Sequence, residues 1–140
     1  MKFYFRLIFI AFLFASCHKK EKNTTSSELV MYQPSEMASL MNTMYYMNAD
    51  IKKKILNNEN IGSFPERYLT IHTAKLTDNN DRTSDFEKFS LKYIDNMKLL
   101  YKENPQNQKS NFNKAVQSCI ACHQTSCRGP ISRIKKLLIK

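Results

Sequence analysis

Glycine, proline and tryptophan are scarce in this chain: its 140 residues include 2 glycines, 4 prolines and no tryptophan. Turns and bulges between β-strands draw heavily on glycine and proline, so the scarcity argues against a β-sandwich and favours long helices. The sequence also has no glycine-rich loop that could cradle a phosphate, no Ser-His-Asp arrangement and no cleft-like pair of carboxylates. An enzyme acting on an organic substrate is therefore not what the sequence predicts.

No apolar run in the chain is long enough to cross a bilayer. The most apolar stretch, Leu7–Phe14, is far shorter than the roughly 20 residues that a spanning helix needs. Lys2 and Arg6 precede it, and small residues separate it from Cys17, which is typical of a signal peptide. The five residues ending at Cys17 also resemble a bacterial lipobox, in which lipid is attached to the cysteine. We expect a signal peptide at 1–16 and lipidation of Cys17; a secreted protein with a free Cys17 is the alternative.

The segment that follows the expected lipidation site is polar. Residues 18–28 lack the large apolar side chains needed to build a core, so we expect a flexible tether at 17–30 and a folded domain at 31–140. The start of this tether is basic rather than acidic, which offers no acidic export tag. We therefore expect a position on the periplasmic side of a bacterial membrane, which is either the inner or the outer membrane.

Apolar residues recur every three or four positions in several segments, which predicts amphipathic helices. The expected spans are 35–57, about 63–76, 84–101, a fourth helix with Phe112, Val116 and Cys119 on one face, and a tail helix over 131–138. Capping boxes at Ser63–Glu66 and Ser84–Glu87 are expected to open the second and third helices. Short connections favour an antiparallel arrangement. The predicted fold is all-α, an antiparallel four-helix bundle followed by a short C-terminal tail helix.

Cys119-Ile120-Ala121-Cys122-His123 spells C-x-x-C-H, the attachment motif of a c-type haem. Two thiols three positions apart can each add to one vinyl group of the porphyrin, and the histidine that follows can bind the iron as proximal ligand. Thioether attachment of haem takes place outside the cytoplasm in bacteria, in agreement with the expected signal peptide. We expect one haem c per chain, held by Cys119 and Cys122, with His123 on the iron.

Three other uses of the motif remain open. A thioredoxin-like dithiol needs a βαβ context, and no alternation of strands and helices is visible. A structural zinc site could use Cys119, Cys122, His123 and Cys127, although adjacent ligands at 122 and 123 suit a tetrahedral site poorly. A plain disulfide needs no histidine at all.

A C-x-x-C-H motif on the last helix of a four-helix pattern resembles the class II c-type cytochromes, the cytochrome c′ family. The resemblance covers about residues 31–125; Cys127 and the tail after Gly129-Pro130 extend past the usual end of the family. It implies haem on the fourth helix, His123 as proximal ligand, and a distal residue on the first helix. Members of this family with a distal methionine are six-coordinate, while five-coordinate members bind small gases.

The first predicted helix offers several methionines for the distal position. Met44 is the first candidate because it lies in the middle of the apolar stripe, and Met41 is the second. His72, on the predicted second helix, is the alternative axial ligand. Each of these methionines can instead serve as core filling, since methionine packs well into irregular interiors. A methionine opposite His123 would raise the reduction potential and favour electron transfer.

The charge of the chain is +10 at pH 7, and removal of Lys2 and Arg6 with the signal peptide leaves +8. Such a basic protein suits an acidic redox partner or anionic lipid headgroups, and nucleic acid is not expected for an exported chain. The predicted function is that of a lipid-anchored monohaem cytochrome that carries electrons and is not an enzyme. The alternatives are a five-coordinate haem protein for nitric oxide, carbon monoxide or peroxide, and a haem-free metal-binding lipoprotein. A homodimer is compatible with each of these three functions.

Overall fold

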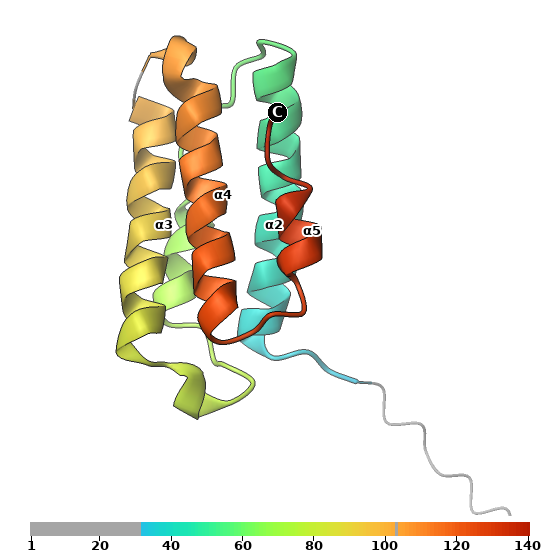
Figure 1. Ribbon diagram of the computed structural model, residues 1–140, viewed down its shortest axis with the longest axis vertical. Helices are drawn as coiled ribbons and strands as arrows, with labels where there is room; N and C mark the ends of the chain where they lie inside the picture. Colours follow the sequence, from blue (N-terminus) through green and yellow to red (C-terminus); the bar gives the residue numbers. More distant parts are fainter. Residues whose placement is uncertain (1–31, 103) are drawn as a thin grey trace, which may run out of the picture. The chain divides into compact units, whose positions relative to one another are not determined.

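The computed structural model describes residues 32–102 and 104–140. All the secondary-structure elements assigned in these residues are helices. The all-α prediction is confirmed for these residues. The α-helices are α2 (Glu36–Leu56), α3 (Ser84–Lys102), α4 (Gln108–Thr125) and α5 (Ile131–Lys135), and the 3₁₀ helices are η2 (Glu66–His72), η3 (Asn79–Asp81) and η4 (Pro105–Asn107) (Figure 1). The expected signal peptide, Cys17 and the tether at 17–30 lie outside the described residues. No helix in the described part is both long and apolar enough to span a membrane.

The first helix, α2, forms nearly where the apolar period predicts it. Ser35 caps its start, because the side-chain oxygen accepts a hydrogen bond of 3.1 Å from the backbone N–H of Ala38. Its buried face consists of Met37, Leu40, Met44, Asn48 and Ile51. The sequence predicts Met47 on this buried face, whereas the structure buries Asn48 there. The reason is that residues four apart on a helix share a face, so Asn48 follows Met44. A polar amide therefore lies in the middle of the core.

The second predicted helix is shorter and tighter than expected. The sequence predicts an α-helix through about Leu76, whereas the structure has the 3₁₀ helix η2, which ends at His72. Ser63 does not cap it; extended Pro65 precedes it without a side-chain cap. The β-branched residues Thr70 and Ile71 disfavour a regular α-helix here. Thr70 Oγ1 donates to the carbonyl of Arg67 at 2.8 Å, a bond between residues three apart that suits a 3₁₀ turn.

The predicted bounds of the third helix agree closely with the structure, and the predicted fourth helix is present as α4. α3 begins at Ser84, as predicted, but its cap lies one residue earlier: the Oγ1 of Thr83 accepts a hydrogen bond of 3.2 Å from the N–H of Phe86. α3 and α4 lie side by side and make the most extensive contact between helices (Figure 1). Phe112 and Val116 of α4 are fully buried in the core, together with Met97 and Leu100 of α3.

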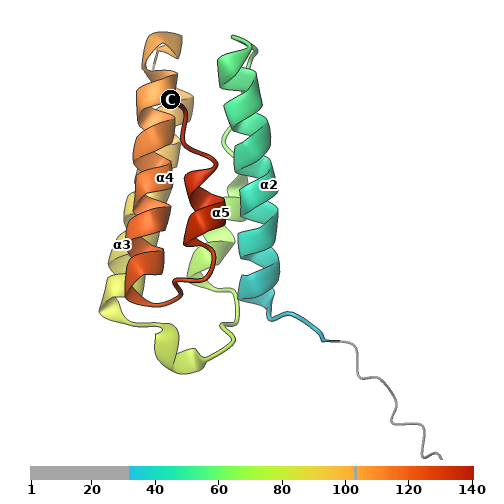
Figure 2. The same ribbon diagram turned by 45° about the vertical axis from the view of Figure 1, so that its right-hand side comes forward.

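The C-terminal segment is part of the core rather than an appended tail. Of the tail helix predicted over 131–138, only α5 is an α-helix, and it ends at Lys135. Ile134, Leu137 and Ile139 are nevertheless all buried. α5 lies between α2 and α4 (Figure 2). Asn113 of α4 fastens the end of the chain, donating to the carbonyl of Ile139 at 2.8 Å and accepting from its N–H at 2.9 Å. Lys52 of α2 donates to two carbonyls of the same segment at 2.8 and 2.9 Å.

Candidate functional site

The C-x-x-C-H motif occupies the last turns of α4. The helical period determines which side of α4 the motif thiols occupy. Phe112 and Val116 anchor α4 in the core, and Cys119 follows them on the same side and packs against the core. Cys122, one turn later, and His123 are half-buried. Cys119, Cys122 and Cys127 are free thiols, so the two motif thiols are both available for attachment.

The imidazole of His123 is held by the backbone just after the helix. Its Nδ1 lies 2.8 Å from the carbonyl oxygen of Cys127. A carbonyl only accepts hydrogen bonds, so Nδ1 carries the proton and Nε2 keeps a free lone pair. Histidines that bind metals in proteins are commonly oriented in this way, by a hydrogen bond from the other ring nitrogen to a carbonyl or carboxylate. The turn that contains Cys127 therefore prepares His123 to act as a ligand through Nε2.

Burial keeps both motif thiols protonated at neutral pH. It raises the pKa of the Cys119 thiol to about 12, with a further contribution from the nearby Cys122. Burial also raises the pKa of Cys122. A thioredoxin-like dithiol works through a lowered thiol pKa, so this environment is the opposite of what that chemistry needs. Among the described residues, no group of three or more His, Cys, Asp or Glu side chains is placed to hold a metal ion.

A buried polar cluster lies beside Cys119, and sequence reasoning missed it. Asn48 Nδ2 donates to the hydroxyl of Tyr93 at 3.0 Å, and the hydroxyl of Tyr68 donates to Asn48 Oδ1 at 3.3 Å. Burial raises the pKa of both tyrosines, and a charge on Cys119 would raise both further. These three side chains come from α2, η2 and α3. The two tyrosines lie close enough to Cys119 of α4 to interact with it electrostatically. The available signal was Asn48 itself, a polar residue on an otherwise apolar helical stripe.

The candidate distal ligands occupy different environments. Met44 is buried at 5% exposure and lies one turn before Asn48 on the core face of α2. Met41 is half-buried and packs against the same core. His72 lies at the end of η2, where its Nδ1 is 3.5 Å from Ser90 Oγ. Among the three, Met44 is the one that shares the fully buried core face with the polar cluster next to Cys119.

In comparisons with protein-family models, curated proteins and solved structures, nothing matched this chain.

Proposed function

We propose that this chain is a lipid-anchored monohaem c-type cytochrome that carries electrons on the periplasmic side of a bacterial membrane. The observation that carries the proposal is the hydrogen bond from His123 Nδ1 to the carbonyl of Cys127, directly after two free thiols in C-x-x-C-H spacing. This bond supplies what a haem ligand needs and a dithiol or disulfide does not: a fixed ring with Nε2 open for the iron.

The residues present fit a covalently held haem. Cys119 and Cys122 would hold the porphyrin by thioether bonds, and His123 would bind the iron. When bound, haem supplies a one-electron couple whose potential depends on its axial ligands and on the exclusion of water. The core side of α4 excludes water through Phe112 and Val116, which are 0% and 1% exposed. The methionine-rich face of α2 is suited to repacking around a large cofactor, because methionine side chains are flexible.

The finer architecture and the sixth ligand belong to the same proposal. We place α2, η2, α3 and α4 in an antiparallel four-helix bundle of the cytochrome c′ type, with haem on α4 and with α5 as an additional packed element. Met44 is the distal ligand in this proposal, because it is the buried methionine of α2 that lies nearer in sequence to Asn48 of the cluster beside Cys119. His123 and Met44 would together bind the iron, and a histidine–methionine pair raises the reduction potential and favours electron transfer.

A second function is favoured by the polar cluster. The amide of Asn48 and the hydroxyl of Tyr93 are buried hydrogen-bonding groups near the attachment thiol. The polarity and donors of a distal pocket decide between binding of small ligands and electron transfer. A five-coordinate haem that binds nitric oxide, carbon monoxide or peroxide is therefore the second candidate.

The experiment is expression in bacteria able to mature c-type cytochromes, followed by mass spectrometry of the denatured chain and absorption spectra of the oxidised and reduced protein. We expect the mass of one haem per chain, lost in the double variant Cys119→Ser/Cys122→Ser. Cys127→Ser is the matched control, because it removes a thiol but keeps the carbonyl that holds His123. An apo mass for the wild-type chain in these cells overturns the haem proposal; copper or zinc bound to that apo chain identifies a haem-free metal-binding lipoprotein.

A further inference from the structure

Negative side chains are absent from the last quarter of the chain. No aspartate or glutamate follows Glu103, whereas positive side chains continue to the end. The basic residues after Glu103 are Lys109, Lys114, Arg128, Arg133, Lys135, Lys136 and Lys140. The carboxylates of the folded unit all come from residues before α4, so its charge is divided unevenly between its elements.

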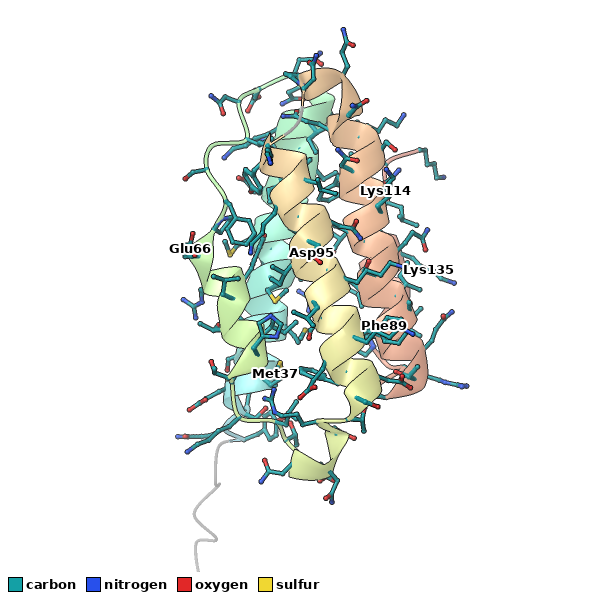
Figure 3. The ribbon with its side chains drawn as sticks, turned by 90° about the vertical axis from the view of Figure 1, so that its left-hand side faces the viewer. Met37, Glu66, Phe89, Asp95, Lys114 and Lys135 are labelled. Carbon is teal, nitrogen blue, oxygen red and sulfur yellow. The ribbon has the colours of Figure 1, made fainter. Side chains whose placement is uncertain are left out.

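These cations gather on one part of the folded unit, namely α4 and the segment packed beside it. Lys114 and Lys135 point to the same side in Figure 3, and Glu66 lies on the opposite side. We define the basic face as the exposed cations of this part, which are Lys109, Lys114, Arg128, Lys135, Lys136 and Lys140. No ion pair joins any of them to a described carboxylate; the ion pair that the described residues contain is Lys54 with Asp50 on α2.

Arg133 is excluded from the basic face because it has a structural role. Its guanidinium lies 3.8 Å from the ring centre of Tyr45 and donates to Asn42 at 3.0 Å. It therefore holds α5 against α2, and its charge already interacts with the ring of Tyr45 within the fold.

The basic face contains no large exposed apolar side chain. The large apolar side chains exposed in the described residues are Tyr32, Tyr46, Leu56, Leu91 and Leu99, all of them before α4. Binding to this face would therefore rest on charge and hydrogen bonds with little apolar burial. Such contacts are typical of fast, weak and salt-sensitive encounters, the class to which electron-transfer complexes belong.

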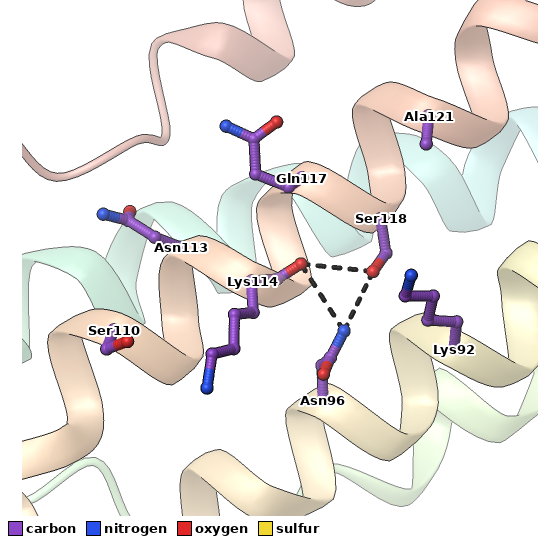
Figure 4. Close-up of a pocket in the computed structure, with 8 residues that line it drawn as sticks. All are labelled: Lys92, Asn96, Ser110, Asn113, Lys114, Gln117, Ser118 and Ala121. Atoms are coloured by element: carbon purple, nitrogen blue, oxygen red, sulfur yellow. Dashed lines mark hydrogen bonds between the residues drawn. The ribbon is translucent and has the colours of Figure 1, made fainter.

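A polar groove between α3 and α4 adjoins this face (Figure 4). Lys92 of α3 and Lys114 of α4 supply ammonium groups to it, and amides and hydroxyls make up most of the remaining lining, with no carboxylate among them. Asn96 Nδ2 and Ser118 Oγ are fixed to each other at 2.9 Å. α3 itself carries both signs of charge, with Asp95 next to Asn96. Most of the side chains that line the groove belong to α4, so α4 supplies most of the hydrogen-bond donors that a carboxylate could bind there.

We propose that the basic face, with the groove at its edge, docks an acidic protein whose carboxylates pair with its lysines. The inference rests on the proposed function in one respect: the partner exchanges electrons with a haem held by the same helix, α4. Exposed lysines that form no ion pair within the described residues attract a negative surface over roughly 10 Å at 0.1 M salt and raise the rate of encounter. The lack of an exposed apolar side chain favours this partner over a bilayer, into which nothing on the face could insert.

The test uses the haem-loaded chain in its Cys17→Ser form, which carries no lipid to insert into a bilayer, and two probes, polyglutamate and vesicles of phosphatidylglycerol mixed with phosphatidylcholine. The variant Lys114→Glu/Lys135→Glu reverses two charges of the basic face. The matched control Lys53→Glu/Lys75→Glu makes the same change in net charge at exposed lysines outside the face. We expect the first variant to bind polyglutamate about tenfold more weakly than the wild type at low salt, and the control to stay within about twofold.

Electron exchange supplies the second measurement. On a gold electrode coated with a carboxylate-terminated monolayer, the wild type and the control should give a voltammetric wave that the Lys114→Glu/Lys135→Glu variant loses. Equal weakening of both double variants, or tighter binding to vesicles than to polyglutamate, overturns the docking proposal. These outcomes are distinct from failure of the proposed function, which is an apo mass for the same preparation.

Discussion

Replacing Met44 by leucine removes a thioether sulfur and nearly preserves the volume of the side chain. Met44 is 5% exposed on the core face of α2, so truncation to alanine would cost about 2–5 kcal/mol through the cavity it leaves. An apolar exchange that conserves volume usually costs less than about 1.5 kcal/mol. For the haem-free chain we therefore expect Met44→Leu to lower the free energy of unfolding by less than about 1.5 kcal/mol, measured by urea denaturation.

The haem-loaded chain separates packing from ligation. With Met44 on the iron, Met44→Leu removes a bond that the haem-free chain never makes, so the loaded chain loses more stability than the haem-free chain does. The absorption band of ferric methionine-ligated haem then disappears, and the ferrous form binds carbon monoxide. Met41→Leu is the control, because Met41 packs against the same core from the same helix. The reasoning is refuted if loaded Met44→Leu keeps the band and loses no more stability than its haem-free form.

Three further predictions concern the fold, the thiols and the anchor. Asn113→Ala removes both hydrogen bonds to the backbone of Ile139 and should cost about 1–3 kcal/mol, with faster hydrogen exchange at the Ile139 amide; unchanged exchange would contradict the fastening role. The folded pKa of Cys119 lies above the ordinary 9.0, so in the haem-free chain its thiol contributes stability that is complete below pH 9 and is lost as the pH rises towards 12. The loss due to Cys119 should be up to about 1.4 kcal/mol per pH unit, so haem-free Cys119→Ala should lose less stability than the wild type between pH 8 and pH 10.5 in urea denaturation; an equal loss would contradict the assignment to Cys119. Cys17→Ser should move the protein into the soluble fraction or leave it unprocessed, and a processed chain that stays with membranes at high salt would argue against lipidation.

The long helices were predictable from the sequence because their apolar residues follow the helical period over several turns. α2 begins one residue after the predicted Ser35 because that serine caps it, a local interaction that the sequence displays directly. η2 was mistaken for an α-helix because its seven residues are too few for periodicity to distinguish a 3.0-residue from a 3.6-residue turn. Local patterns therefore predict long elements better than short ones.

What the sequence could not predict are contacts between residues far apart along the chain. The burial of Ile139 depends on Asn113, 26 residues earlier, and on Lys52 of α2. An apolar period over 131–138 is compatible with a free amphipathic helix, and the packed segment differs from it through these long-range hydrogen bonds. The orientation of His123 could not be predicted for a different reason, because its acceptor, four residues later, is a backbone carbonyl that no side-chain motif specifies.

In the proposed haem protein, the choice between electron transfer and gas binding depends on one turn of α2. Met44 and Asn48 share its buried face and lie four residues apart, which is about 6 Å along the helix axis. Met44 would supply a thioether ligand to a bound haem and so favour electron transfer. Asn48, whose amide is hydrogen-bonded to Tyr93, would instead supply polar groups that favour binding of a small molecule. Because the methionines can repack while the Asn48–Tyr93 pair is fixed by hydrogen bonds, the methionine side of this face is the one that can yield space to a porphyrin. That asymmetry favours Met44 as the residue over the iron, and loss of the methionine band in Met44→Leu is its direct consequence.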